Sequence, residues 1–259
     1  MKRRDLAAAG AICIAAAAFS AAEPSGWLGG LSKDSLFWLR HQAQGEAAAP
    51  PHRVAVIAID EETYRRPPFQ SVPKVTWTPQ IARVLDATIA ADAAVVGFDL
   101  ILPTSVERFL PGHDRDFLIA LRRASQKGKV VLGKVQHQTS PIAPFPAQSF
   151  AVGNARNIRS VNVEEDADGV IRRIPLWFRA TGPGGTTRIE PSMAMELAAR
   201  ASGKPIRIGP DMPVKFGDRE VPLRAPDDGM LLDFDTRPGS IPTYSLADLL
   251  SNVSAPGTD

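Results

Sequence analysis

Three short runs of branched apolar residues, separated by helical patterns, are the feature that most constrains the fold of this chain. They are VAVIAID at 54–60, AAVVGFD at 93–99 and VVLGKVQ at 130–136. Runs of this length and composition are typical of strands buried on both faces of a sheet. Thr78 as the N-cap and Pro79 at the first helical position predict a helix over 78–91. Residues 54–99 therefore predict a strand, helix, strand unit with parallel strands.

Further helices and strands follow these runs. Amphipathic patterns predict a helix over 114–127, ended by Gly128, and another over 191–202, ended by Gly203. Shorter elements are predicted as strands at 206–208 and 230–234 and as a helix at 246–250. The predicted fold class is α/β, with a mixed, largely parallel central sheet, flanking helices and a β-hairpin.

An apolar segment at the N-terminus bears on where the rest of the chain resides. The chain begins MKRRD, and 17 uncharged residues follow from Leu6 to Ala22. As a helix they would extend about 26 Å, close to the roughly 30 Å of a bilayer core. The segment fits an uncleaved membrane helix with its basic end in the cytoplasm, and it also fits a cleaved signal peptide. We favour the anchor, in the inner (cytoplasmic) membrane, with the following residues in the periplasm or outside the cell.

The domain organisation follows from changes in composition. Residues 1–23 are interpreted as the membrane anchor or signal peptide, and residues 24–52 as a juxtamembrane linker that contains a short helix capped by Ser32. Residues 53–259 form the predicted extracytoplasmic domain.

Charge and motif content exclude several classes of function. Lys plus Arg number 30 and Asp plus Glu number 28, and the basic N-terminus accounts for the difference. A chain without a clustered basic surface is not expected to bind nucleic acid. The single cysteine, Cys13, lies in the apolar segment, and the four histidines lack the paired spacing of a zinc site. Phosphate-binding loops and the nucleophile elbow are absent, so neither a cofactor nor a metal is predicted.

Acidic residues follow two of the predicted strands. Asp60, Glu61 and Glu62 come after the first strand, and Asp99 ends the second. Ligands of open α/β sheets bind outside the carboxyl ends of the strands. If the two strands are neighbours in one sheet, Asp60 and Asp99 lie at the same edge. Asp60, Glu61 and Asp99 are therefore candidate ligand-binding residues, although the same side chains also suit helix capping.

The sequence EDADG at 165–169 predicts a turn between two β-rich runs, 158–164 and 170–180. Asp168 and Gly169 match only the end of a calcium-binding loop, so we interpret the segment as a hairpin turn without a metal. Gly169 is expected to have a backbone conformation that a side chain would hinder.

Taken in order, these motifs resemble the second class of CHASE domain, the cyclase and histidine-kinase associated sensory extracellular domain. The matching words are VAVIAIDEETY, W-T-P before a helix, AAVVGFDLIL, VVLGK, EDADGVIRRIPL, PSMAMELA and PTYSLADLL, across residues 53–251. The resemblance implies an extracytoplasmic α/β sensor with one N-terminal membrane helix, further membrane helices and an adenylate cyclase, kinase or phosphodiesterase output domain. Asp168, Gly169 and Arg172 match the family pattern and carry an implied structural role.

The function predicted from the resemblance is sensory input to a bacterial transmembrane receptor, and the chain by itself is not expected to be an enzyme. Its predicted partners are the membrane and an unidentified small-molecule or environmental stimulus, and homodimerisation stays open. Because the family pattern continues with a further strand and membrane spans, we interpret the chain as C-terminally truncated. The alternative is a secreted periplasmic enzyme or binding protein that uses the acidic edge near Asp60 and Asp99.

Overall fold

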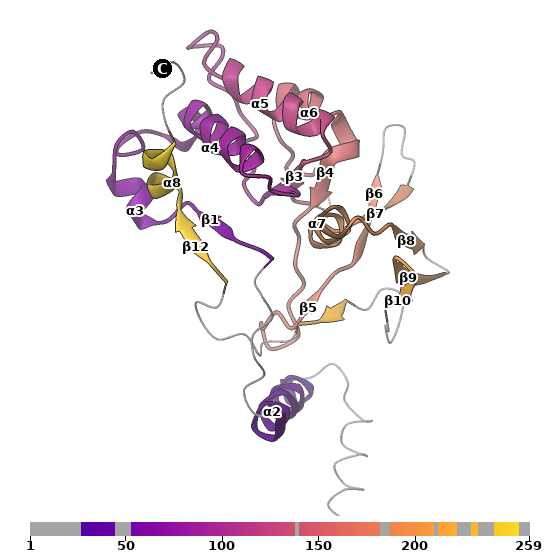
Figure 1. The fold of residues 1–259 in the computed structure, drawn as a ribbon. Helices are drawn as coiled ribbons and strands as arrows, with labels where there is room; N and C mark the ends of the chain where they lie inside the picture. The colour runs from indigo at the N-terminus through magenta and orange to yellow at the C-terminus, as the bar shows by residue number, and fades with distance from the viewer. Residues whose placement is uncertain are drawn as a thin grey trace, which may run out of the picture. The chain divides into compact units, whose positions relative to one another are not determined.

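The computed structural model describes residues 27–44, 53–137, 140–181, 187–209, 212–221, 229–232 and 241–253 (Figure 1). The predicted anchor at 1–23 lies outside these residues, and none of the described helices is both long and apolar enough to cross a membrane. The chain divides into two compact units. The first contains the described parts of Met1–Pro51, Val163–Ile174 and Met230–Ser240, and the second contains the rest.

Parallel strands form the centre of the second unit. Strands β2 (Val96–Phe98), β3 (Val130–Lys134) and β4 (Ile158–Ser160) form one parallel sheet in the order β2-β3-β4. Strand β1 (Val56–Ala58) pairs in parallel with β12 (Thr243–Ser245), a strand nearly 190 residues away in the sequence. The three predicted strands are therefore present, and each has a parallel partner. The prediction that β1 and β2 share a sheet is wrong, because the pairing of β1 is with β12.

Helices cover both faces of the three-stranded sheet (Figure 1). Val130 and Leu132 of β3 belong to the main hydrophobic core, which includes buried residues of four helices. These helices are α4 (Thr78–Ala90), α5 (Arg115–Gln126), α6 (Pro146–Ala151) and α8 (Leu246–Asn252). Gly133, the residue after Leu132, faces the other way, because a Cβ on it would lie 3.6 Å from Met193 of α7 (Met193–Ser202). Alternate residues of a strand point to opposite faces, so α7 covers the second face.

The start of α4 differs from the sequence prediction. The N-cap is Trp77, and Thr78 is the first helical residue. The Thr78 hydroxyl donates to Asp114 Oδ1 at 2.6 Å, and Ser105 donates to Asp114 Oδ2 at 2.6 Å. Asp114 is 3% exposed and precedes α5, so this buried carboxylate joins the start of one helix to the start of the next. Local sequence does not reveal this role of Thr78, because its hydrogen-bond partner lies 36 residues further along the chain.

The remaining elements of the second unit are short and mostly antiparallel. β6 pairs with β7, and β9 pairs with both β8 and β10. Ser192 caps α7 by accepting from the Met195 N–H, and Gly203 ends it with φ of +67°, as predicted. The bounds of the other elements are α3 (Glu61–Arg65), η1 (Lys74–Thr76), α6 (Pro146–Ala151), η2 (Asn154–Asn157), β6 (Trp177–Thr181), β7 (Thr187–Pro191), β8 (Ile206–Gly209), β9 (Met212–Phe216) and β10 (Arg219–Glu220).

The first unit consists of one helix, the EDADG turn and a two-stranded ribbon. Helix α2 (Trp27–Gln44) starts before Ser32, the predicted cap, and has 18 residues. Strand β5 (Arg173–Ile174) pairs in an antiparallel manner with β11 (Met230–Leu231). The predicted hairpin is therefore smaller than expected: its arms meet at one bridge, Glu164 to Arg173. Its first arm is short because β4 pairs with β3 instead.

Candidate functional site

Asp60, the first candidate ligand-binding residue, is the N-cap of α3. Its Oδ1 accepts hydrogen bonds of 2.9 Å from the Thr63 N–H, the Thr63 hydroxyl and the Ser245 hydroxyl. These bonds, the Thr63 N–H first, hold the pKa of Asp60 below its ordinary value in spite of partial burial. Asp60 thus links the end of β1 to the end of its partner strand β12.

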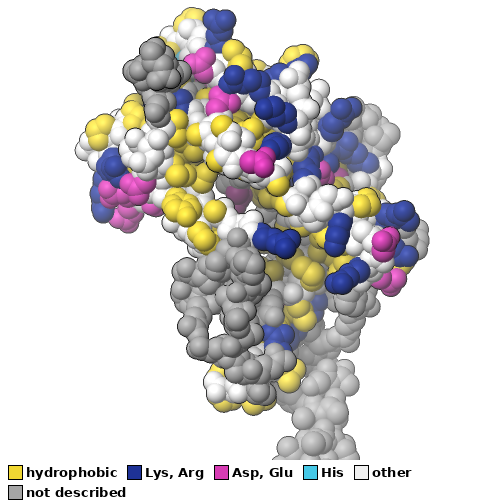
Figure 2. Space-filling view, viewed as in Figure 1, with side chains coloured by type: hydrophobic (Ala, Val, Ile, Leu, Met, Phe, Trp, Pro, Cys, Tyr) yellow, Lys and Arg dark blue, Asp and Glu magenta, His cyan; other side chains and the backbone are white. Residues whose placement is uncertain are grey.

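The neighbouring acidic residues lie on the surface. Glu61 pairs with Arg65 at 2.6 Å, and Glu62 lies 3.5 Å from Arg66, which also pairs with Asp248. Figure 2 shows acidic and basic side chains side by side at the left edge, where α3 lies in Figure 1. Asp99 is exposed after β2. The expectation that Asp60 and Asp99 lie at one sheet edge required β1 and β2 to share a sheet, and they pair with different strands. Ligand binding by these residues stays a prediction.

Replacing Asp60 with alanine is expected to lower the free energy of unfolding by about 1 kcal/mol, because the cap is lost. Asp60→Asn keeps an acceptor oxygen and should cost less. The folded pKa is depressed, so the contribution of the carboxylate is present above the unfolded value near 3.8 and is lost as the pH falls through the folded pKa. Urea unfolding at about pH 7 and about pH 3 measures both effects. A wild-type advantage over Asp60→Asn that grows in acid would contradict this account.

The EDADG turn is tight and closed by its own backbone. The Gly169 N–H donates to the Asp166 carbonyl at 2.8 Å, and the Asp166 N–H donates to the Val170 carbonyl at 2.9 Å. Gly169 has φ of +77°, the conformation that the sequence predicted for it. The Val170 N–H donates to Asp168 Oδ1 at 3.2 Å. These bonds fix the shape of the turn that carries the side chains of Asp166 and Asp168.

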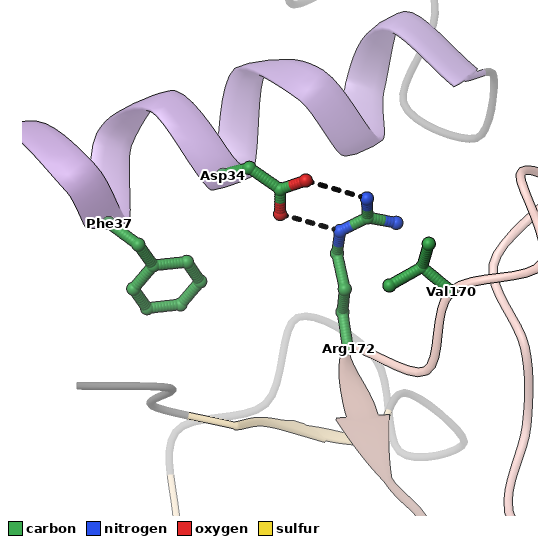
Figure 3. A pocket seen from close by; sticks show the side chains of 4 residues that line it. All are labelled: Asp34, Phe37, Val170 and Arg172. Carbon is green, nitrogen blue, oxygen red and sulfur yellow. Dashed lines mark hydrogen bonds and ion pairs between the residues drawn. The ribbon is translucent and has the colours of Figure 1, made fainter. Parts of the chain in front are cut away.

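Arg172 lies at the centre of an ion cluster that joins this turn to α2 (Figure 3). Its side chain is 3% exposed and binds Asp34 of α2 through two parallel bonds, Nε to Oδ1 and Nη2 to Oδ2, each 2.8 Å. Nη1 donates to Asp168 at 2.7 Å and to Asp166 at 3.3 Å. Lys33 of α2 lies 3.2 Å from Asp166. We call Lys33, Asp34, Asp166, Asp168 and Arg172 the Arg172 cluster.

Electrostatics favour the charged state of this cluster. The hydrogen bond from Arg172 is the largest cause that lowers the pKa of Asp34, and it also lowers the pKa of Asp168. The two carboxylates in turn raise the pKa of Arg172, Asp34 more than Asp168. Bidentate pairing of a guanidinium with a carboxylate fixes direction as well as distance. The cluster therefore holds α2 in a defined rotation about its own axis.

Close approach of α2 to the turn depends on Gly30. A Cβ at this position would overlap Asp168 Oδ2 and lie 2.8 Å from Arg172 Nη1. Asp34, Phe37, Val170 and Arg172 line a cavity of about 320 Å³ beside the ion pair (Figure 3). Sequence reasoning identified Asp168, Gly169 and Arg172 but missed Gly30, Lys33 and Asp34, because residues 24–52 were interpreted as a linker. The sequence did contain a signal for this contact: in residues 29–34, two glycines precede a Lys-Asp pair on a helical segment.

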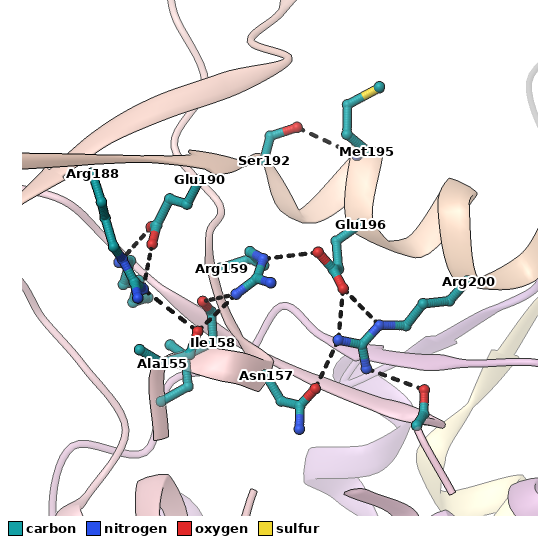
Figure 4. A network of polar contacts seen from close by, with 12 residues as sticks. Ala155, Asn157, Ile158, Arg159, Arg188, Glu190, Ser192, Met195, Glu196 and Arg200 are labelled. Carbon is teal, nitrogen blue, oxygen red and sulfur yellow. Dashed lines mark hydrogen bonds and ion pairs between the residues drawn. The ribbon is translucent and has the colours of Figure 1, made fainter. Parts of the chain in front are cut away.

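A second polar network fastens α7 to the sheet (Figure 4). Glu196 of α7 pairs with Arg159 of β4 at 2.9 Å and with Arg200 at 2.6 Å. Arg200 also donates to Asn157 Oδ1 and to the Val130 carbonyl of β3. Nearby, buried Glu190 lies 2.5 Å from Lys134 Nζ and 2.9 Å from Arg188 Nη2. Glu196 and Arg200 thus hold α7 against β4 and β3, whereas Glu190 joins strand β7 to β3.

The described residues combine two features. A parallel α/β core is combined with an ion cluster that joins the helix behind an apolar N-terminal segment to a turn. Within the described residues, no group of three or more His, Cys, Asp or Glu side chains is placed to hold a metal ion.

The family is then shown by comparison. The model described as CHASE2 domain matches residues 10–259, so the chain belongs to the CHASE2 family of extracellular sensory domains. The resemblance found in the sequence is confirmed. No curated protein and no solved structure matches the chain.

Proposed function

We propose that this chain is the extracytoplasmic input domain of a bacterial transmembrane receptor, held in the cytoplasmic membrane by its N-terminal segment and coupled to an adenylate cyclase or kinase output domain. Membership of the CHASE2 family supports the sensory role. The apolar run from Leu6 to Ala22 behind a basic N-terminus supports the anchor. The observation that carries the proposal is the Arg172 cluster, which fastens the helix that follows this run to a turn of the sensor.

The chain connections suggest how a stimulus reaches α2. The turn lies in sequence between β4, which ends at Ser160, and β6, which begins at Trp177, and both strands belong to the second unit. A stimulus that shifts these strands acts on the turn through the few residues at either end. Asp168 and Arg172 transmit the shift to Asp34, and α2 moves with respect to the membrane. The stimulus can drive this change only as far as it binds one arrangement better than the other.

Location is tested with the complete chain expressed in a bacterium. Alkaline phosphatase fused behind residue 253 is expected to be active, and the same fusion to a fluorescent protein that folds only in the cytoplasm is expected to be dark. The chain should stay with the membranes after an alkaline wash, and mass spectrometry should find residues 1–22 intact. A mature chain that begins at Glu23 would contradict the anchor and favour the secreted alternative.

Signalling is tested by releasing α2 in the receptor with its native output domain. Arg172→Met removes the guanidinium and is expected to change the basal output, because α2 loses its fixed rotation. The matched control is Arg123→Met, since Arg123 is exposed and its pair with Asp86 joins α5 to α4. Basal output that Arg172→Met leaves at the wild-type level, in protein present at wild-type amounts, would overturn the relay.

A further inference from the structure

Helix α2 has two faces of different character. The face on the turn includes buried Gly30 and half-buried Lys33, Phe37 and Arg40. Successive residues of a helix are rotated by about 100°, so Leu31, Ser35, Trp38, Leu39 and Gln42 share the opposite side. We call these five residues the outer face. Leu31 is 55% exposed, Trp38 61% and Leu39 53%.

The outer face is uncharged along its whole length. The helix carries Lys33 and Asp34, but these bind Asp166 and Arg172 of the turn. Arg40 lies on the side of the turn, over the ring of Phe37 at 5.3 Å. A solvated helix normally presents charged side chains away from its packing face. An exposed, uncharged face with a Trp and two Leu is typical of a surface that contacts another molecule.

Building on the proposed function, we propose that the outer face packs against the same face of a second copy of this chain. Residues 1–26 precede α2, and their apolar run would hold both copies in one membrane with the same orientation. Two such helices are parallel and level, so each outer face meets its own twin around a twofold axis. Without charges on this face, the close approach brings no like charges together, and the small side chain of Ser35 leaves room at the centre.

The alternative occupant, the bilayer surface, fits the charges less well. Helices that lie in the membrane interface carry Lys and Arg on the polar face, free to reach lipid phosphates. Here Lys33 is engaged with Asp166. The size of the contact also agrees with a tethered pair, because an 18-residue helix is about 27 Å long and offers much less than the roughly 800 Å² per partner of a stable soluble dimer. Anchoring in one membrane compensates through a high effective concentration.

Pairing through the outer face would connect the Arg172 cluster to the second copy. One side of α2 binds the turn through Asp34, and the other would bind the second copy through Leu31 and Trp38. A movement of the turn then changes the packing between the two copies. The ion pair and the helix contact act in series, so loss of either uncouples the sensor from the membrane.

Disulfide crosslinking in membranes tests this pairing. Cys13→Ser removes the only cysteine, and Ser35→Cys then places one thiol on the outer face. Ser202→Cys is the matched control, because Ser202 is also an exposed helical serine whose hydroxyl bonds to the carbonyl four residues earlier. Mild oxidation of washed membranes is expected to link Ser35→Cys into dimers several-fold more than Ser202→Cys. Adding Leu31→Lys, at unchanged protein level, should reduce the linked fraction to that of the control.

The outcomes separate this proposal from the proposed function. Chain in the membrane fraction with equal linking of the two cysteine variants overturns the pairing and leaves the receptor intact. Chain in the soluble fraction contradicts the membrane receptor, and the pairing with it. A nitroxide on the Ser35→Cys thiol that is accessible to lipid-dissolved oxygen, but not to a water-soluble relaxation agent, shows that the bilayer covers the outer face and also overturns the pairing.

Discussion

Replacing Arg172 with methionine is expected to lower the free energy that holds α2 on the turn by about 2–3 kcal/mol. Arg172 is nearly fully buried and binds three carboxylates, and methionine keeps most of the volume while it removes the charge. Asp34, Asp166 and Asp168 are then left with Lys33 as the remaining cation of the cluster. This loss of free energy is smaller than for a fully buried ion pair, because Asp34 is 53% exposed and can regain water.

Hydrogen exchange of the α2 amides measures this effect locally, because one helix can open without unfolding of the second unit. Exchange in α2 is expected to accelerate by roughly 30- to 150-fold, and exchange in β3 should be unchanged. Arg123→Met breaks an exposed pair and should alter exchange in α4 and α5 by less than about fivefold. Equal protection of α2 in wild type and Arg172→Met would show that the cluster does not hold the helix.

Adding a single methyl group at Gly133 is expected to lower the free energy of unfolding of the second unit by about 2 kcal/mol. Gly133 lies in the buried middle of β3, and a Cβ there would be 2.7 Å from the Phe98 carbonyl oxygen and 3.0 Å from Val161 Cγ1. The carbonyl belongs to the neighbouring strand β2, so it can move only if the parallel sheet is distorted. Close packing leaves no space to absorb that shift.

Gly97→Ala is the matched control, because it also adds a methyl group to a glycine of the same sheet. There the nearest atom is Leu197 Cδ1 at 2.6 Å, the far end of a flexible side chain of α7. A rotamer change relieves this contact, so the loss of stability should be clearly smaller. Urea unfolding at neutral pH compares the two variants. A larger loss for Gly97→Ala than for Gly133→Ala would contradict the assignment of Gly133 to the crowded position.

Local patterns in the sequence were sufficient for the elements that depend on near neighbours. The helix ended by Gly203 and the turn at Gly169 were both predicted, because their end signals lie within a few residues of the backbone they shape. Strands β2 and β3 were predicted from runs of branched apolar residues. The order of the motifs across residues 53–251 also sufficed for the family.

Pairings over long distances in the sequence were decided only by the tertiary structure. The pairing of β1 with β12, the bond of Thr78 to Asp114 and the ion pair of Asp34 with Arg172 each join residues far apart in the chain. In each case the sequence offers several possible partners of suitable chemistry. The packing of the folded chain decides which of them make contact. Composition, local pattern and family therefore come from the sequence itself. The assignment of Asp60 to a cap, and of Asp34 and Arg172 to one cluster, needed the three-dimensional arrangement.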